Sequence, residues 1–421
     1  MNRRLKILMS AYACEPGKGS EPEVGWQWAL QMSRFHDVTV LTRANNRTAI
    51  EGARAQLAEL TCPPRFVYHD LAPLWTKLKK RLNATQLYYI QWQRSARARV
   101  SALHREHRFD LLHHTTFASC RYPIAITGHG TASLWGPVGG MESVPVSLLS
   151  WRHPLSVLKE IARNASNAFQ SSVAGPLRGR ASACSKVLAS TEAMQRVLRE
   201  LGIDSELMPT IGMNPEELPF REHSRAAGPL RIVYAGNLMA FKGLALVIEA
   251  MHRSGTDSTL TLIGSGDQQA SLEDLARRLG LASRVRFLGR LPRADVLRLY
   301  PDYDLSVFLS LRDTGGYAVL ESMLNELPVI CFDCGGPALA VQPECGIRIP
   351  VTNRDAVVNA IASALRFYDQ DRTALRRHGK NARAAVLTNY SWENKAREMD
   401  RIYQATTSGS STSSATGARV R

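Results

Sequence analysis

Two carboxylates and a pair of glycines make the stretch from Asp304 to Pro337 the first candidate for a chemical site. Gly315 and Gly316 lie between a buried-strand pattern and a short apolar-periodic run that predicts a helix. Glycine permits a close backbone approach, and a helix N-terminus presents free N–H groups and a partial positive charge, which suits a phosphate. Asp313 precedes the glycines and Glu321 follows them. This arrangement indicates a nucleotide-sugar site, with Glu321 on the ribose and Asp313 on the sugar hydroxyls.

The spacing alone leaves open the alternative that Glu321 only caps a helix in an ordinary doubly wound domain. The stretch resembles the E-x7-E region of family 4 retaining glycosyltransferases, with Asp313 in the place of the first Glu. The resemblance implies that Tyr317 and Ala318 join the two glycines in binding the nucleotide-sugar donor through the start of the helix.

Two further segments of the second half extend this resemblance. AGNLMAFKG, which contains Gly236 and Lys242, is similar to the first loop of the family's nucleotide domain, so Lys242 is expected to contact the diphosphate. Asn237 stands where the family usually has an Arg. GSGDQQASLEDLARRLGLASRVRFLGRL resembles the family's Gly-x-Gly turn, helix and base-contacting loop, and this places Gly264, Arg290 and Leu291 near the donor.

The first half carries two glycine-rich segments of its own. YACEPGKGSEPEVGW, with Gly17 and Gly19, and WGPVGG, with Gly139 and Gly140, resemble a bacterial polysaccharide-biosynthesis branch of the same family, although Glu23 stands where a glycine is expected. By resemblance these loops meet the transferred sugar or the acceptor. From the residues alone, an acceptor loop and a phosphate contact remain equal alternatives for the first of them.

His113 and His114 end a predicted strand, and strand ends of doubly wound sheets line the ligand cleft. Successive strand residues face opposite ways, so only one of them can point into the cleft. Many family members carry a histidine after the following strand, but WGPVGG has none. We therefore expect the catalytic histidine to be His114, with His113 as the alternative, or to be absent.

Retaining transfer without a protein nucleophile needs positioning and stabilisation of the leaving diphosphate. Lys242 and the N–H groups of Gly315–Ala318 would supply positive potential there. The sequence holds no DxD pair at a strand end, so we expect no metal and no cofactor besides the nucleotide diphosphate sugar itself.

Strands and helices alternate along the chain, which predicts an α/β protein with parallel sheets wrapped by helices. We expect two doubly wound Rossmann-like domains that face each other across a cleft, the GT-B fold of the family. The predicted parts are residues 1–207, a linker 208–229, a donor domain 230–390, a closing helix 391–404 (SWENKAREMDRIYQ) that returns to the first domain, and a disordered tail 405–421. Within the first domain we expect a helix Thr48–Leu60, one long basic helix Leu74–His107 and an irregular segment Met141–Arg180.

The composition and charge of the chain indicate its cellular compartment and the kind of partner it binds. The 421 residues contain no apolar run of spanning length, and the seven cysteines lack a disulfide framework, so we expect a cytoplasmic protein. The net charge of +16 is concentrated in residues 1–205, which carry 27 Lys and Arg against 14 Asp and Glu. The segment 76–108 holds nine of these basic residues, with Tyr88, Tyr89 and Trp92 interleaved, which favours an anionic membrane surface. A solvated helix face is the alternative, and no motif supports nucleic acid.

The resemblance, taken with these observations, implies a metal-independent retaining hexosyltransferase that passes a sugar to a glycan, expected to be lipid-linked, in cell-surface polysaccharide (exopolysaccharide) biosynthesis. It would work at the inner face of the plasma membrane. The rival hypotheses are a nucleotide-sugar epimerase or phosphorylase of the same fold, and a basic binding protein without catalysis.

Overall fold

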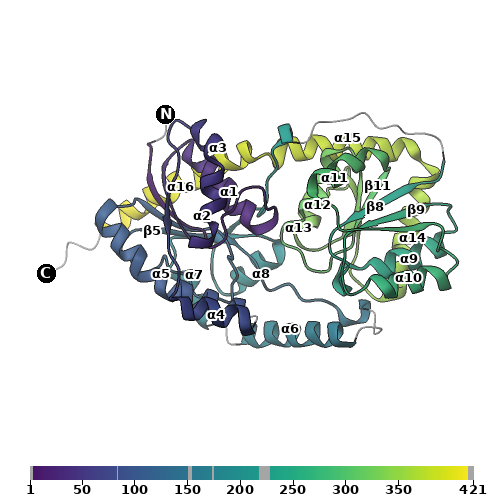
Figure 1. The fold of residues 1–421 in the computed structure, drawn as a ribbon, viewed down its shortest axis with the longest axis horizontal. Coiled ribbons are helices and arrows are strands. Elements are labelled where there is room, and N and C mark those ends of the chain that lie inside the picture. The colour runs from purple at the N-terminus through teal and green to yellow at the C-terminus, as the bar shows by residue number, and fades with distance from the viewer. Residues whose placement is uncertain (1–2, 83, 150–153, 173–174, 218–227, 416–421) are drawn as a thin grey trace. The chain divides into compact units, whose positions relative to one another are not determined.

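The computed structural model describes residues 3–82, 84–149, 154–172, 175–217 and 228–415. The chain forms two compact units, coloured along the sequence in Figure 1. The first comprises Met1–Met141, Val173–Thr210 and Trp392–Arg421, and the second comprises Glu142–Ser172 and Ile211–Ser391. Residues 142–172, which we expected within the first domain, group with the second unit.

The first unit is built on a seven-stranded sheet whose strands all run parallel, in the order β3-β2-β1-β4-β5-β6-β7. Its strands are short and apolar on both faces, as expected when helices cover both sides. The bounds are β1 Lys6–Ser10, β2 Asp37–Thr42, β3 Arg65–Tyr68, β4 Leu111–His114, β5 Ala132–Val138, β6 Lys186–Ala189 and β7 Ser205–Leu207.

Helices on both faces of this sheet complete the first unit. On one face, Trp28 of α1 meets Trp392 of α16 edge to face at 5.1 Å. On the other face, Trp92 of α5 packs into an aromatic core with Tyr12. The bounds are α1 Ser20–Ser33, α2 Arg47–Gly52, α3 Arg54–Ala58, α4 Pro73–Leu82, α5 Thr85–His107, α7 Gly175–Ser182, α8 Glu192–Glu200 and α16 Trp392–Ala415.

The second unit repeats the pattern with six parallel strands in the order β10-β9-β8-β11-β12-β13. Numbered within each unit, both sheets follow the doubly wound order 3-2-1-4-5-6, which the first sheet extends by a seventh strand, so the order reverses beside the first strand of each. The bounds are β8 Arg231–Ala235, β9 Thr259–Ile263, β10 Val285–Gly289, β11 Leu305–Phe308, β12 Val329–Phe332 and β13 Gly346–Ile349.

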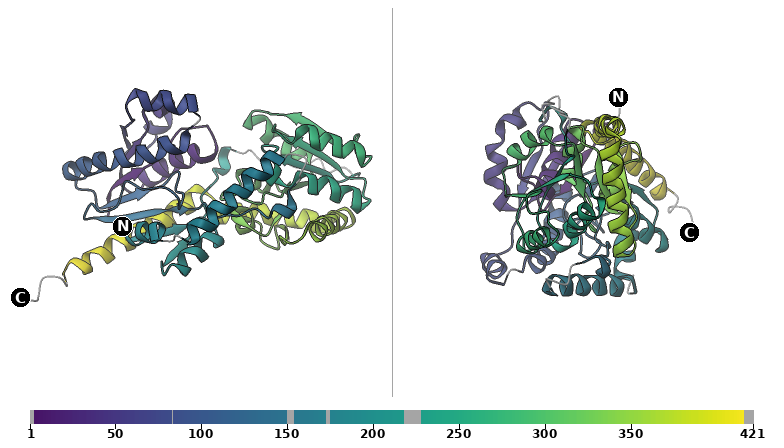
Figure 2. Two further views of the ribbon diagram at one scale, coloured as in Figure 1. Left: turned by 90° about the horizontal axis from the view of Figure 1, so that it is seen from below. Right: turned by 90° about the vertical axis from the view of Figure 1, so that its right-hand side faces the viewer.

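The helices of the second unit also lie on both faces of its sheet (Figures 1 and 2). α9 packs against α10 and α14 on one face, and α12 packs against α15 on the other. The bounds are α6 Pro154–Ser172, α9 Leu244–Ser254, α10 Gln269–Arg278, α11 Arg293–Leu299, α12 Tyr317–Leu324, α13 Gly335–Ala340, α14 Arg354–Gln370 and α15 Arg372–Asn389.

Several predicted elements differ from the structure. The expected helix Leu74–His107 is two helices, α4 and α5, and the expected helix Thr48–Leu60 is likewise divided into α2 and α3. The segment Met141–Arg180, predicted to be irregular, contains the 19-residue helix α6 and the start of α7. The last helix continues to Ala415, past the predicted end at 404, and 416–421 lie outside the described residues.

Candidate functional site

Lys242 and Asp313 meet at the point where the strand order of the second sheet reverses. Lys242 lies in the loop after β8, and Asp313 lies in the loop after β11, so the two loops flank the switch point at the carboxyl edge of the sheet. The Lys242 Nζ and an Asp313 carboxylate oxygen are 2.9 Å apart, and both side chains are partly buried. The fold thus pairs two residues that the sequence assigned to the donor site separately.

Asp313 also holds its own loop in place. Its second carboxylate oxygen accepts a hydrogen bond from the Gly315 N–H at 3.1 Å. α12 starts after Gly316, which has a φ of 81°, and no side chain caps it. Asp313 therefore does not cap α12 but closes a turn inside the loop that precedes it. Its carboxylate faces Lys242 and the backbone at once.

Close backbone packing accounts for the glycines around this point. A Cβ on Gly243 would lie 2.6 Å from the Leu309 carbonyl oxygen, and one on Gly335 would lie 2.5 Å from the Asp313 carbonyl oxygen. Gly264 packs even closer, since its Cβ would come within 1.9 Å of the Gly236 carbonyl oxygen. Real Cβ contacts are never this short, so side chains at these positions would push the loops after β8, β9, β11 and β12 apart.

Aromatic rings support the cations of the site. The Lys242 ammonium lies 4.8 Å from the ring centre of Phe308, and the Arg312 guanidinium lies 4.1 Å from that of Phe241. Arg312 also forms a 2.8 Å ion pair with Glu160 of α6. Ring faces attract cations, so these rings help to hold the two positive charges at this edge of the sheet beside their carboxylate partners.

Glu321, predicted to bind ribose, is buried with a side chain only 8% exposed, and its carboxylate forms a 2.6 Å ion pair with the Nε of Arg293. Arg293 is the first residue of α11 and is 43% exposed. Arg293 was not among the predicted site residues. The available signal was general: a carboxylate on an otherwise apolar helix needs a partner when it is buried.

The remaining donor residues lie around the same carboxyl edge. Arg290 and Leu291 follow β10, where Arg290 is exposed and Leu291 packs against a small core cluster. Tyr317 and Ala318 begin α12 and are half-buried. The structure therefore gathers the residues predicted for the donor site on one edge of one unit.

His113, the alternative catalytic histidine, lies in the core of the first unit with no exposed surface. Its Nε2 donates to the Gly136 carbonyl at 2.9 Å, so its Nδ1 accepts from the Tyr403 hydroxyl at 2.6 Å. Burial lowers its pKa to about 4, which keeps the ring neutral. Both nitrogens thus form hydrogen bonds that join β4 and β5 to α16, and this placement gives no support to a catalytic role for His113.

His114 is equally buried, at the end of β4. Its Nε2 lies 3.2 Å from the Tyr89 hydroxyl, which itself donates to the Phe117 carbonyl at 3.1 Å. Burial lowers the pKa of His114 to about 3. A neutral ring without surface does not reach a substrate in this structure, so the placement gives no support to the predicted preference for His114.

The glycine loops of the first unit occupy its own carboxyl edge. Gly17 and Gly19 both have φ near 69°, and the Gly17 N–H donates to Glu23 at 2.7 Å. Gly139 pairs with the backbone around Ser119, and Gly140 has a φ of 115°. Glu23, noted as the departure from the family's glycine, therefore closes the first loop by a hydrogen bond. A role of these loops toward sugar or acceptor stays a prediction.

The three aromatic residues assigned to a membrane face point inward instead. Tyr88, Tyr89 and Trp92 are at most 4% exposed and belong to the core of the first unit. The aromatic part of the membrane hypothesis for 76–108 is therefore wrong, because these rings already pack against the sheet. The exposed residues of this segment include Lys77, Arg94 and other basic side chains.

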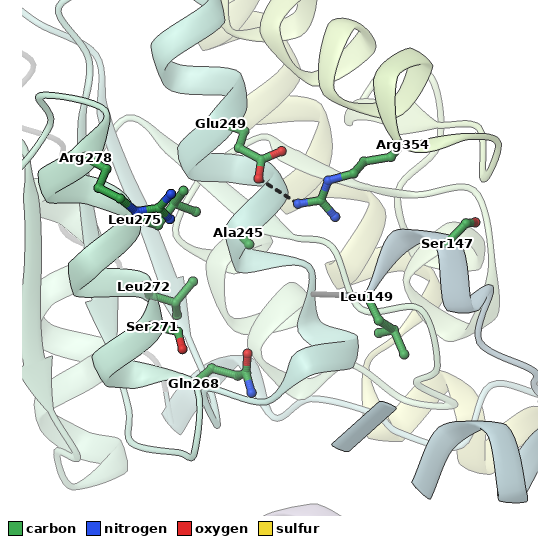
Figure 3. A pocket seen from close by; sticks show the side chains of 10 residues that line it. All are labelled: Ser147, Leu149, Ala245, Glu249, Gln268, Ser271, Leu272, Leu275, Arg278 and Arg354. Atoms are coloured by element: carbon green, nitrogen blue, oxygen red, sulfur yellow. Dashed lines mark hydrogen bonds and ion pairs between the residues drawn. The ribbon is translucent and has the colours of Figure 1, made fainter. Parts of the chain in front are cut away.

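A separate pocket of about 380 Å³ lies elsewhere in the second unit (Figure 3). Glu249 and Arg354 form a 2.6 Å ion pair at its wall, and Arg354 also donates to the Leu148 carbonyl at 3.1 Å. Leu148 belongs to the short helix η2, Val146–Leu148. None of the predicted donor residues lines this pocket.

Comparison with known proteins adds independent information on the second unit. Residues 216–384 match the family model described as glycosyl transferases group 1. The glycogen synthase of Mycobacterium tuberculosis is 29% identical over 202 residues, which are 47% of this chain and 48% of that protein. The chain thus spans about half the length of the curated relatives it matches. The resemblance to glycosyltransferases is confirmed for this region, while the branch and family 4 membership stay predictions.

Solved structures extend the likeness in fold to almost the whole chain. Sucrose-phosphate synthase from Thermosynechococcus elongatus has a TM-score of 0.65 at 19% identity and covers 96% of this chain and 100% of its own. The Anabaena protein HepE, solved with UDP and glucose, has a TM-score of 0.61 at 18% identity over 96% of this chain and 100% of its own. The predicted fold class, two Rossmann-like α/β domains of the GT-B type, is confirmed.

Proposed function

We propose that this chain is a metal-independent retaining glycosyltransferase that takes a sugar from a nucleotide diphosphate sugar. The observation that carries the proposal is the meeting of Lys242 and Asp313 at the switch point of the unit that matches the glycosyltransferase family. Ligands of doubly wound sheets bind at this point, outside the carboxyl ends of the strands. A cation and a carboxylate there suit a diphosphate and a sugar.

The ion pair between Lys242 and Asp313 describes the protein before the donor binds. A diphosphate carries more negative charge than one carboxylate, so it competes for the Lys242 ammonium. Asp313 is then released toward the hydroxyls of the donor sugar. The start of α12 at Tyr317 and Ala318 adds positive potential for the phosphates, because a helix N-terminus carries a partial positive charge.

Glu321 is the residue that we assign to the ribose hydroxyls. Arg293 holds one of its carboxylate oxygens at 2.6 Å, and we assign the other oxygen to the ribose. In this arrangement Arg293 is a positioning residue, since it fixes the rotation of the carboxylate without needing to touch the nucleotide. Glu321 is buried, so without this partner its charge would be costly to keep in the protein.

Changing Glu321 tests this assignment. We expect Glu321→Gln to weaken nucleotide binding by about 1.5–3 kcal/mol, the usual contribution of a hydrogen bond to a charged group. We expect Arg293→Ala to weaken it in the same direction and Arg293→Lys to recover part of the loss. Isothermal titration of nucleotide diphosphates with and without the ribose 2′-hydroxyl measures both effects.

The 2′-deoxy comparison separates positioning from stability. If Arg293 orients Glu321, the wild type loses affinity for the 2′-deoxy nucleotide, and Arg293→Ala discriminates less between the two ligands. Arg298→Ala is the matched control, because Arg298 lies on the same helix in an exposed 2.8 Å pair with Asp295. Equal discrimination in the wild type and Arg293→Ala would remove the positioning role.

The identity of the donor is tested directly. Thermal-shift measurements with UDP, GDP and ADP report binding, since a ligand that binds the folded state stabilises it by mass action. The structure of the Anabaena protein with UDP makes UDP the first choice. A panel of nucleotide sugars, with the anomeric configuration of the product read by NMR, then tests retaining transfer. Absence of any nucleotide binding would refute the proposed function.

The acceptor and the location are finer parts of the proposal. We propose a glycan acceptor, lipid-linked and part of bacterial cell-surface polysaccharide biosynthesis, reached at the cytoplasmic face of the plasma membrane. Among the described residues, no helix has the length and apolar character needed to cross a bilayer. Exposed basic residues in 76–108, rather than the buried aromatic rings, support contact with anionic lipid.

Charge reversal in this segment provides a test. We expect conversion of Lys77, Lys79, Lys80 and Arg81 to Glu to weaken binding to anionic vesicles while nucleotide binding is retained. Each near-surface charge contributes about 1 kcal/mol, and added salt screens it. Vesicle sedimentation at low and high salt measures the change. Vesicle binding by the wild type that is equally strong at low and high salt would contradict this part of the proposal.

A further inference from the structure

The helix α6 exposes its apolar side. Leu155, Leu158, Ile161 and Phe169 are 73%, 53%, 38% and 67% exposed, whereas Val157 is fully buried. Ala162 and Ala165 are also exposed, so the apolar residues form one stripe at helical spacing along the outer face. A helix of a globular protein normally turns such a stripe toward the core.

Specific polar contacts hold α6 in this orientation. The Glu160 carboxylate is buried in its 2.8 Å pair with Arg312. The Asn164 side chain donates to the Val144 carbonyl at 2.7 Å and accepts from the Val144 N–H at 3.0 Å. Near its first turn, the Ser156 hydroxyl donates to Asp267 at 2.8 Å. Rotation of the helix to bury the stripe would break all of these contacts and leave buried polar groups unpaired.

The segment before α6 is fixed to the second unit as well. Asn167 donates to the Glu142 carbonyl at 3.0 Å, and Arg354 donates to the Leu148 carbonyl at 3.1 Å. The polar side of α6 is therefore the side that packs against the second unit. The apolar stripe is therefore available to a binding partner outside the second unit, since a contiguous exposed apolar face marks an interaction surface.

We infer that the stripe of α6 inserts into the surface of an anionic lipid bilayer. The exposed charge of the helix is positive: Lys159 is exposed and Arg163 half-buried, while the acid Glu160 is neutralised inside by Arg312. A helix with large apolar residues on one face and basic residues beside them lies in the plane of a membrane interface.

Charge also selects lipid over a second copy of the chain. Each copy carries a net charge of +16, so two copies repel each other, whereas an anionic bilayer attracts the protein. The inference does not depend on the proposed enzymatic function. It adds an apolar contact on the second unit to the electrostatic contact proposed for 76–108, and the two differ in their response to salt.

Vesicle flotation with the full chain tests the inference. The triple variant Leu155→Ser, Leu158→Ser and Phe169→Ser should bind vesicles of phosphatidylcholine with 30% phosphatidylglycerol about 100-fold more weakly than the wild type, because three large apolar side chains no longer enter the lipid. The control is Phe367→Ser with Leu387→Ser, two exposed apolar residues of α14 and α15 in the same unit. This control should bind like the wild type.

Further measurements keep the result interpretable. Circular dichroism and thermal melting establish that the triple variant is folded, as expected for substitutions on the surface. Its loss should persist in 0.5 M salt, where exposed charges are screened. Equal vesicle binding by the triple variant and the wild type overturns the inference. A wild type that does not bind the vesicles overturns it as well. If the wild type is a dimer and the triple variant is a monomer, the stripe contacts a second copy of the chain, and the inference of lipid insertion is overturned too.

Discussion

Replacement of Lys242 by alanine is expected to lower the rate of sugar transfer by about 100-fold or more, with a smaller effect on nucleotide affinity. The ammonium lies beside Asp313 at the switch point of the second unit, where the leaving diphosphate would gain charge in the transition state. Removing one group that stabilises a developing charge typically costs about 100- to 1,000-fold in rate. Steady-state kinetics of transfer, with nucleotide binding measured separately, give the two quantities.

The Lys242 prediction needs a control for general loss of charge. Arg253→Ala serves, because Arg253 lies in the same unit and pairs with Asp355 at 3.3 Å on the surface. Exposed pairs of this kind contribute about 0–1 kcal/mol to stability, so the control should keep the wild-type rate. A Lys242→Ala variant that is as active as Arg253→Ala would exclude Lys242 from the reaction.

Asp313→Asn is expected to reduce transfer by about tenfold to 100-fold while nucleotide affinity is retained. A charge-assisted hydrogen bond to a sugar hydroxyl contributes about 1.5–3 kcal/mol, and the nucleotide is held by other residues. Asp is one methylene shorter than the family's Glu, so its carboxylate reaches about 1.5 Å less far. The glycines beside it allow the loop to approach the sugar, and we expect Asp313 to influence which sugar is accepted.

A second substitution separates the sugar contact from the loop contact. Asparagine can still accept the hydrogen bond from the Gly315 N–H, whereas alanine cannot. If Asp313 only holds the loop, Asp313→Asn keeps the transfer rate and Asp313→Ala loses about 1 kcal/mol of stability. If Asp313 binds the sugar, both variants lose transfer. Wild-type transfer by Asp313→Asn would refute the sugar contact.

Much of the fold follows from local patterns. Short strands buried on both faces, separated by helical segments, predict parallel sheets because only crossover helices cover both sides. The division of Leu74–His107 into α4 and α5 was not predicted, because a basic sequence with helical spacing does not by itself show an interruption. The helix α6 was missed for a different reason. Its serine and asparagine residues suggest a loop, yet Asn164 bonds the backbone of Val144 and stabilises the helix against the unit.

The residues of the candidate site also fall into those that were predicted from the sequence and those that only the structure revealed. Asp313 and Glu321 were predicted from the glycine turn between them, and Lys242 was predicted from the resemblance of its loop to that of a known family. Arg293 was not assigned, because its ion pair with Glu321 joins two separate helices and depends on how α11 and α12 pack. The outcome for His113 depends on α16, whose Tyr403 returns from the far end of the chain to bond it.

The sequence by itself thus determined most of the elements and the doubly wound class, because periodicity and turn chemistry are local properties. Only the tertiary structure decided which side of each element is buried. Tyr88, Tyr89 and Trp92 turned out to be core, whereas Leu155, Leu158 and Phe169 lie at the surface. The physical reason is that amphipathic spacing specifies two faces of a helix, whereas the apolar packing and the polar contacts offered by neighbouring elements together select the face that is buried.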